Sequence, residues 1–230
     1  MPNGIFIAYA HEDRDLAIRV RDSLERINEF RPYLAADYPA AGENFKERIM
    51  NAIWGCNVFI VFLTENGMKS QWVNQELGYA CRVKKQKKGN FRIIPVTKHN
   101  LNLKGFITTD TQDVLFLDDN DFEYIIANIF IQIRLSIYNA SRIGGLNVKH
   151  YCTSCTDVQG LPIELISSLP SHEDYVKALS LGNIEWYHQC HRCQRKIWFK
   201  LTTFEKIKTE ETYRDPFTER PFRFDPRQPR

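Results

Sequence analysis

The amino-acid sequence predicts an α/β fold over residues 1–140, followed by a small unit held together by a metal ion. Two observations carry this prediction. Strand-like and helix-like segments alternate along residues 5–138, which is typical of an open parallel sheet with helices on both faces. Beyond them, four of the six cysteines form two CxxC pairs in the C-terminal third of the chain.

Five strands are expected in the sheet. The segment at residues 57–64 is almost wholly apolar, which is typical of a central parallel strand buried on both faces. The other four strands are expected at residues 5–10, 32–36, 91–97 and 114–117. Apolar residues recur every three or four positions between them, which predicts helices at residues 11–27, 45–55, 70–88 and 122–138.

Composition and motifs exclude several classes of function. The formal net charge is only +3, which argues against a general nucleic-acid binder. No GxGxxG follows the first strand and no GxxxxGK[ST] occurs, so the usual dinucleotide and P-loop sites are not favoured. The longest apolar runs fall far short of the roughly 20 residues that span a bilayer. With no recognisable targeting segment, we expect a cytoplasmic protein without membrane contact.

The helix after the most buried strand carries a pair of residues suited to chemistry. Trp72 and Glu76 are four residues apart and therefore share a face, near the sheet edge where such folds bind ligands. An aromatic beside a carboxylate suits a sugar–base compound, because carboxylates stabilise the oxocarbenium-like transition state of glycoside chemistry. The alternative is that Trp72 belongs to the core and Glu76 to the solvated surface.

The same region resembles a TIR (Toll/interleukin-1 receptor) domain over residues 4–138. Three pieces carry the resemblance: the strand at residues 5–9 that ends in Ala-Tyr, the loop and helix at residues 37–56, and the strand at residues 60–64 followed by Ser-x-Trp and the WxxxE of Trp72 and Glu76. The resemblance implies a flavodoxin-like open parallel five-stranded sheet.

The resemblance also implies an activity. In enzymatic TIR domains the Glu of WxxxE, here Glu76, is the catalytic residue of an NAD+ nucleosidase that breaks the nicotinamide–ribose bond. The products are nicotinamide with ADP-ribose, or a cyclic ADP-ribose signal. The implied NAD+-binding residues are Phe6, Tyr9, Ala10, His11, Asp37, Gly42 and Trp72. The loop at residues 37–44 would cover the pocket and take part in self-association.

Standalone proteins of this type resemble antiphage-defence or immune-type signalling proteins. The resemblance therefore implies, as partners, NAD+, further copies of the chain, and a downstream effector that responds to an ADP-ribose-derived signal. The alternative is a non-catalytic TIR scaffold whose C-terminal unit binds a protein or nucleic-acid partner.

The paired cysteines predict a structural zinc ion. Four thiolates make a closed tetrahedral site, and the expected ligands are Cys152, Cys155, Cys190 and Cys193. Expected strands at residues 184–188 and 196–200 flank the second pair, as in a zinc ribbon. The gap between the pairs exceeds the usual roughly 15–20 residues, and a helix at residues 171–181 would fill it. Redox chemistry at the CxxC pairs and substitute ligation by His150, His188 or His191 are alternatives.

The predicted organisation is a TIR domain at residues 1–140, a linker at 141–147, a zinc-ribbon-like domain at 148–212 and an Arg/Pro-rich tail at 213–230. The ribbon mixes cations and aromatic residues, as single-strand nucleic-acid binders do. Its charge is nearly balanced, however, with 13 Lys and Arg against 11 Asp and Glu from residue 145 onward. A role in stability or protein contact is therefore favoured over nucleic-acid binding.

Overall fold

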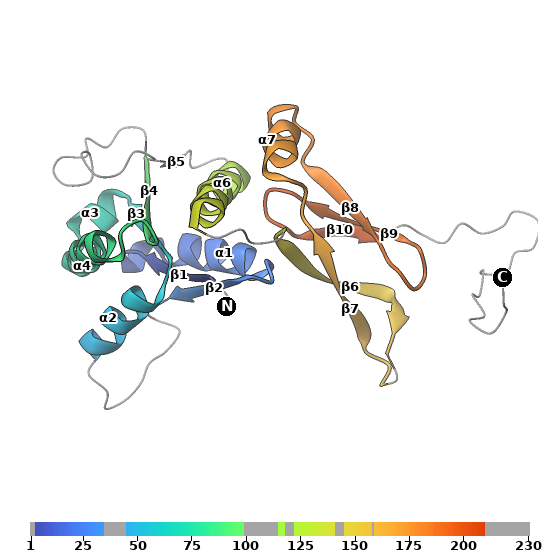
Figure 1. The fold of residues 1–230 in the computed structure, drawn as a ribbon, viewed down its shortest axis with the longest axis horizontal. Coiled ribbons are helices and arrows are strands. Elements are labelled where there is room, and N and C mark those ends of the chain that lie inside the picture. The colour runs from blue at the N-terminus through green and yellow to red at the C-terminus, as the bar shows by residue number, and fades with distance from the viewer. Residues whose placement is uncertain are drawn as a thin grey trace, which may run out of the picture.

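The computed structural model describes residues 3–34, 45–98, 115–117, 122–140, 145–157 and 159–209. The predicted pocket loop at 37–44, with Asp37 and Gly42, lies outside these residues, and so does the tail at 213–230. Figure 1 shows an α/β part that contains strands β1–β5 and the described helices from η1 to α6, and a second part made of strands β6–β10 and helix α7.

The first part is an open, wholly parallel sheet, as predicted. Its strands are β1 (Asn3–Ala8), β2 (Phe30–Leu34), β3 (Val58–Leu63), β4 (Arg92–Lys98) and β5 (Leu115–Leu117). Their order is β2-β1-β3-β4-β5, with every neighbouring pair parallel. This is the flavodoxin-like strand order. Four strands have five to seven residues, whereas the edge strand β5 has three.

Helices cover both faces of the sheet (Figure 1). One face carries α1 (Arg14–Glu25) and α6 (Phe122–Ala140), and the other carries α2 (Phe45–Gly55) and α4 (Gln71–Lys87). All six residues of β3 are buried, because its side chains alternate between these two apolar layers. No helix in the described part of the chain is long and apolar enough to cross a membrane.

Several element boundaries differ from the sequence prediction. Strand β1 begins and ends two residues early, because its first residue pairs with Phe30 at the start of β2. The helix expected from residue 11 begins as the 3-10 turn η1 (His11–Asp13). The short helix α3 (Glu65–Lys69) was not predicted, since five residues give too little periodicity to reveal a helix.

The second part consists of two antiparallel sheets and one helix. The hairpin β6 (Asn147–Thr156) and β7 (Pro162–Ser168) forms the first sheet. The strands β8 (Glu185–Gln189), β9 (Lys196–Lys200) and β10 (Lys206–Thr209) form the second, in the order β10-β9-β8. Helix α7 (His172–Ser180) connects them close to its predicted position. Strands β6, β7 and β10 were not predicted; β10 reads KIKT, which lacks an apolar run.

The two parts share one hydrophobic core. The Phe130 ring on α6 packs edge-on against the rings of Tyr175 at 5.0 Å and Phe204 at 4.8 Å, both from the second part. Leu146, which falls in the predicted linker, is buried in the same cluster. Apolar contact therefore runs without a break from the parallel sheet through α6 into the second part.

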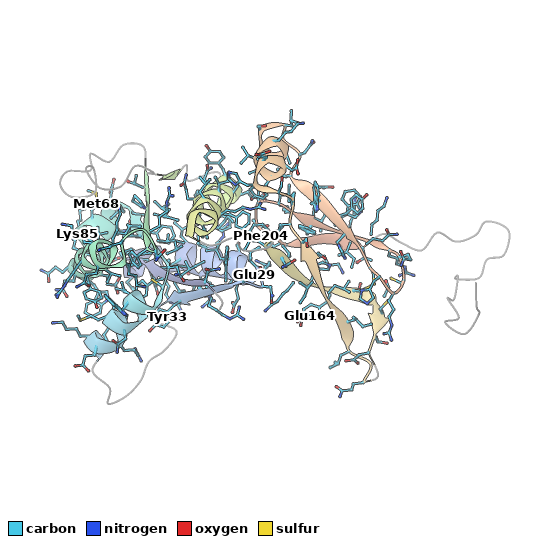
Figure 2. All side chains as sticks on the ribbon, in the orientation of Figure 1. Glu29, Tyr33, Met68, Lys85, Glu164 and Phe204 are labelled. Carbon is cyan, nitrogen blue, oxygen red and sulfur yellow. The ribbon has the colours of Figure 1, made fainter. Side chains whose placement is uncertain are left out.

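Polar contacts reinforce this junction. Glu123 on α6 accepts hydrogen bonds from Lys200 and from Thr202. Glu29 accepts two from Asn147, one from the backbone N–H at 2.9 Å and one from the side-chain amide at 2.7 Å. Figure 2 labels Glu29 and Phe204, which both lie where the two parts meet. These bonds fix the orientation of the second part on the first.

Candidate functional site

Two helix caps place α4 at the carboxyl end of the central strand. The Thr64 hydroxyl, directly after β3, accepts the Gly67 N–H at 2.9 Å and donates to the Asp13 carboxylate at 2.6 Å. The Ser70 hydroxyl then accepts the Val73 N–H at 3.3 Å, as an N-cap does. The first turns of α4 are therefore held at the sheet edge where doubly wound folds bind ligands.

The structure does not place Trp72 in the core and Glu76 on the surface, which was the alternative to a functional role. The Glu76 side chain is 5% exposed, whereas Trp72 is 40% exposed and stacks on the Phe45 ring at 5.1 Å. Burial is therefore reversed: the carboxyl group lies inside and the indole lies at the surface. Carboxylates are seldom buried without a partner, so this arrangement requires an explanation.

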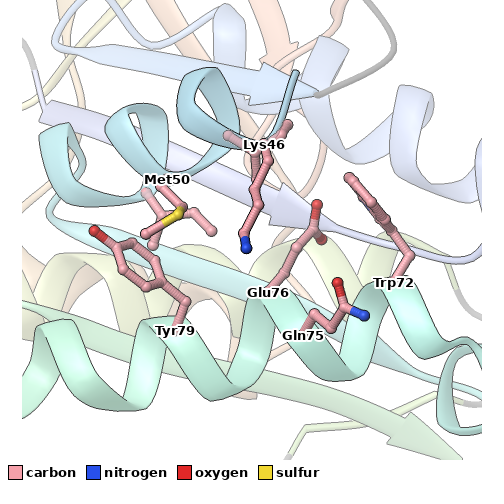
Figure 3. A pocket seen from close by; sticks show the side chains of 8 residues that line it. Lys46, Met50, Trp72, Gln75, Glu76 and Tyr79 are labelled. Carbon is pink, nitrogen blue, oxygen red and sulfur yellow. The ribbon is translucent and has the colours of Figure 1, made fainter. Parts of the chain in front are cut away.

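Glu76 lies on the wall between two adjacent cavities. The smaller cavity, about 290 Å³, is lined by Ile7, Tyr9, His11, Phe45, Ser70, Trp72 and Glu76. The larger, about 350 Å³, lies between α2 and α4 and is lined by Lys46, Ile49, Met50, Ile53, Trp72, Gln75, Glu76 and Tyr79. Figure 3 shows Lys46 and Met50 on α2 facing Gln75, Glu76 and Tyr79 on α4 across the larger cavity.

Burial changes the ionisation of the Glu76 carboxyl. Among the described residues its Oε1 atom is buried without a hydrogen-bond partner. Burial raises the pKa of Glu76 to about 8, although a hydrogen bond from the Trp72 side chain lowers it. Desolvation penalises the charged form, so burial holds this carboxyl largely protonated at neutral pH. A buried carboxyl with a raised pKa at a cavity is a pattern found at functional sites.

The structure brings together four of the predicted NAD+-site residues: Tyr9, His11, Trp72 and Glu76 line the smaller cavity. Phe6 and Ala10 line neither cavity. Phe6 is fully buried, with its ring stacked on those of Tyr33 and Phe59. Phe6 packs in the layer between the sheet and helices α2 and α4, whereas Ile7 belongs to the other layer, and Ile7 is the β1 residue that lines the smaller cavity.

Sequence reasoning missed most of the α2 side of the site. Phe45 and Lys46 begin α2, and Gln75 and Tyr79 flank Glu76 on α4. Helical spacing could have suggested Tyr79, which is one turn beyond Gln75 and on the same side. The approach of α2 to α4 is tertiary, so no local signal in the sequence indicates that Lys46 lies beside this cavity.

The four predicted zinc ligands converge. The Sγ atoms of Cys152, Cys155, Cys190 and Cys193 all lie within 4.8 Å of one another, and no cysteine in the chain is in a disulfide. The Cys152 and Cys193 sulfurs are 3.6 Å apart. Tetrahedral Zn–S bonds of roughly 2.3 Å place sulfurs about 3.8 Å apart, so the residues present fit a metal ion.

Backbone geometry holds the thiols in place. A β-bulge interrupts β6 after Cys152, and Gln194 at φ 60° closes the second turn with its N–H on the Cys190 carbonyl at 2.8 Å. Arg192 and Arg195 bridge to Thr156 and Ser154 beside the first pair. His150 forms a hydrogen bond with Ser167 instead of joining the thiols. Among the described residues, the group of side chains close enough to bind a metal ion consists of the four cysteines alone.

Comparison with known proteins assigns the first part to a family. The first part is a doubly wound sheet of order β2-β1-β3-β4-β5 with a buried Glu on α4, the second helix after β3. The model of the TIR domain family matches residues 5–126, more than half of the chain. The chain therefore belongs to the TIR domain family.

Two solved structures are among those similar to this chain. One is the TIR domain of the Toll-related receptor TRR-2 from the lower metazoan Hydra magnipapillata, with 24% identity, a TM-score of 0.45, and coverage of 56% of this chain and 97% of that one. The other is a 2-desoxiribosyltransferase from Leishmania mexicana, with 20% identity, a TM-score of 0.38, and coverage of 54% and 96%. No curated protein matches the sequence.

Proposed function

We propose that this chain is an NAD+ nucleosidase with Glu76 as its catalytic residue. The observation that carries the proposal is a buried carboxyl with an unpartnered oxygen, shared by two cavities at the ligand-binding edge of a TIR sheet. A carboxyl held in this way costs folding free energy unless a ligand uses it. NAD+ offers the polar and cationic groups that it lacks.

In the proposed reaction the bond between the ribose anomeric carbon and the nicotinamide nitrogen breaks. Its electron pair goes to that nitrogen, which loses its positive charge, and the ribose becomes oxocarbenium-like. The ionised Glu76 stabilises this developing charge or holds the ribose hydroxyls. Water then adds to give ADP-ribose and a proton, or an adenine nitrogen adds to give a cyclic product.

The electrostatics of the site support a cationic substrate. Glu76 is largely protonated at neutral pH because burial raises its pKa to about 8. A pyridinium ring within about 4–6 Å favours the ionised carboxylate. Binding of NAD+ therefore promotes the charge state that the reaction needs. The ammonium of Lys46 at the larger cavity suits a diphosphate, and the exposed face of Trp72 suits a stacked ring.

The direct test incubates the purified chain with NAD+ at high protein concentration and identifies the products by mass spectrometry. The proposal expects free nicotinamide together with ADP-ribose or its cyclic form. Gln71→Ala, an exposed residue of α4 that lines neither cavity, is the matched control for Glu76→Gln and retains most of the activity. No nicotinamide release under conditions in which the chain self-associates contradicts the proposal.

We also propose that the four clustered cysteines bind a structural zinc ion. Four thiolates leave no open coordination position, so this ion would stabilise the fold rather than react. Metal analysis of the purified chain is expected to find one zinc per chain. Cys190→Ser is expected to abolish it, whereas Cys81→Ser, outside the cluster, is expected to leave it unchanged.

Exposed aromatic residues favour self-association as a second property of the TIR domain. Phe45, Trp54 and Trp72 on α2 and α4 are each 40% exposed or more. Such side chains are enriched in protein interfaces. We propose that copies of the chain assemble through this surface in the cytoplasm, in antiphage defence or immune-type signalling, with an effector that responds to the product. A scaffold without chemistry would use the same surface and leave NAD+ intact.

A further inference from the structure

One face of the three-stranded sheet carries exposed aromatic rings between lysines. Strand alternation and register place Glu185, Tyr187, Gln189, Lys196, Trp198, Lys200 and Lys208 on this face, here called the ribbon face. The opposite side carries Ile197 and Phe199, which are buried. The core is thus on one side of the sheet, and the ribbon face is on the other.

Two rings form the centre of the ribbon face. Tyr187 on β8 and Trp198 on β9 are directly opposite in the ladder, with ring centres 4.9 Å apart. Tyr187 is 46% exposed, and Trp198 is half-buried. Exposed aromatic rings beside cations are the side chains that stacking platforms for nucleic-acid bases use.

Each ring has a lysine beside it. The Lys196 ammonium lies 5.0 Å from the Tyr187 ring centre, and that of Lys208 lies 5.5 Å from the Trp198 ring centre. Among the seven residues of the ribbon face Glu185 is the one acid, against three lysines, of which Lys200 is paired with Glu123 on α6. Positive charge therefore borders the aromatic pair, although the C-terminal part as a whole is nearly neutral.

We propose that the ribbon face binds single-stranded nucleic acid. Bases stack on exposed aromatic rings regardless of sequence, while lysines beside the rings contact the phosphates. Two adjacent rings provide stacking positions for bases, and Lys196 and Lys208 lie beside these rings as partners for phosphates. An acidic peptide would match the lysines but would leave the rings without a stacking partner. The proposal is independent of NAD+ cleavage.

The test measures binding of a fluorescein-labelled oligothymidylate to the full chain by fluorescence anisotropy, with an oligouridylate of equal length beside it. Tyr187→Ser is expected to weaken binding roughly 5- to 150-fold, as loss of one base stack does. Lys196→Gln with Lys208→Gln is expected to reduce the slope of log affinity against log salt by about 1 to 1.5.

Matched controls keep the interpretation specific. Tyr124→Ser on α6 removes another exposed tyrosine, and Lys85→Gln with Lys88→Gln removes two exposed lysines, one in the last turn of α4 and one at its C-cap. Both variants, and Glu76→Gln, are expected to bind as the parent chain does. Thermal midpoint and zinc content verify that the ribbon-face variants are folded. No binding of either oligonucleotide, equal loss in the controls, or equal competition by polyglutamate overturns the proposal.

Discussion

Glu76 is the residue on which the proposed chemistry depends, and its burial could not have been read from the sequence. The WxxxE spacing places Trp72 and Glu76 on one face of a helix, but it does not say which of them lies inside. The structure does: α2 packs over α4 so that the carboxyl is enclosed and the indole lies against Phe45. Phe6 lines neither cavity because it packs among buried rings, which the sequence does not reveal, and its part in NAD+ binding stays a prediction.

The raised pKa of Glu76 makes stability depend on pH. Burial raises it from 4.5 to about 8, so between these values the folded chain binds more protons than the unfolded chain. Stability therefore falls as pH rises through this window. Glu76→Gln removes that decline and is expected to be more stable than the parent by a few kcal/mol above about pH 8. Chemical denaturation across the window measures it, and parallel curves for both chains refute the assigned burial.

The same ionisation predicts the pH dependence of catalysis. If the ionised carboxylate acts, kcat/KM for NAD+ rises with pH and levels off above the free-site pKa of about 8. Initial rates of nicotinamide release at low NAD+ concentration give this profile. A profile that falls over the same range indicates that the protonated acid acts instead.

At the scale of elements, the short connection from β3 to α4 determines where Glu76 points. The Gly67 residue of α3 lies so close to β3 that an added Cβ would be 2.0 Å from the Phe62 carbonyl oxygen. Gly67→Ala is therefore expected to destabilise the chain by at least about 2 kcal/mol and to shift α4. Thermal unfolding and nicotinamide release measure the two effects.

Gly78 provides the matched control within α4. An added Cβ at this exposed helical position meets nothing within 4 Å. Gly78→Ala is expected to stabilise the chain by about 0.5–1 kcal/mol, because alanine restricts the unfolded backbone and favours helix. Destabilisation of similar size by both substitutions would show that α3 is not held as described.

The sequence predicted the strongly periodic elements and missed those with weak local signals. The apolar run of β3, the amphipathic α4 and the two strands around Cys190 and Cys193 were all found. Strand β10 was missed because KIKT is polar, and β6 because a CxxC turn interrupts it with a bulge. The two CxxC ligand pairs could be predicted because the spacing of the ligands is local to each turn. The packing of α2 against α4 could not be predicted, since it depends on tertiary structure.

For the whole molecule, the common core implies that the two parts unfold together. Phe130 on α6 contacts both Tyr175 and Phe204 of the second part and also lies against Phe30 of the sheet, at 6.1 Å. Phe130→Ala is expected to destabilise the whole chain by about 3–5 kcal/mol in a single transition. Two transitions in calorimetry, with the sheet unaffected, would show that the parts are independent.

Metal removal tests the same coupling from the other side. Metal binding supplies folding free energy, and the C-terminal part covers α6, so a strong chelator is expected to lower the thermal midpoint of the entire chain. Cys190→Ser should reproduce the effect without chelator, and Cys81→Ser should not. Chelation that leaves the unfolding of the parallel sheet at its original temperature contradicts a metal-dependent common core.

Nicotinamide release by the parent chain and by Glu76→Gln shows whether Glu76 makes this TIR domain an NAD+-cleaving enzyme. Both chains are compared at equal concentration after circular dichroism has established that both are folded. We expect steady release by the parent and a loss of at least about 100-fold in the variant, as for removal of a group that stabilises transition-state charge. Equal release by the two folded chains would contradict it.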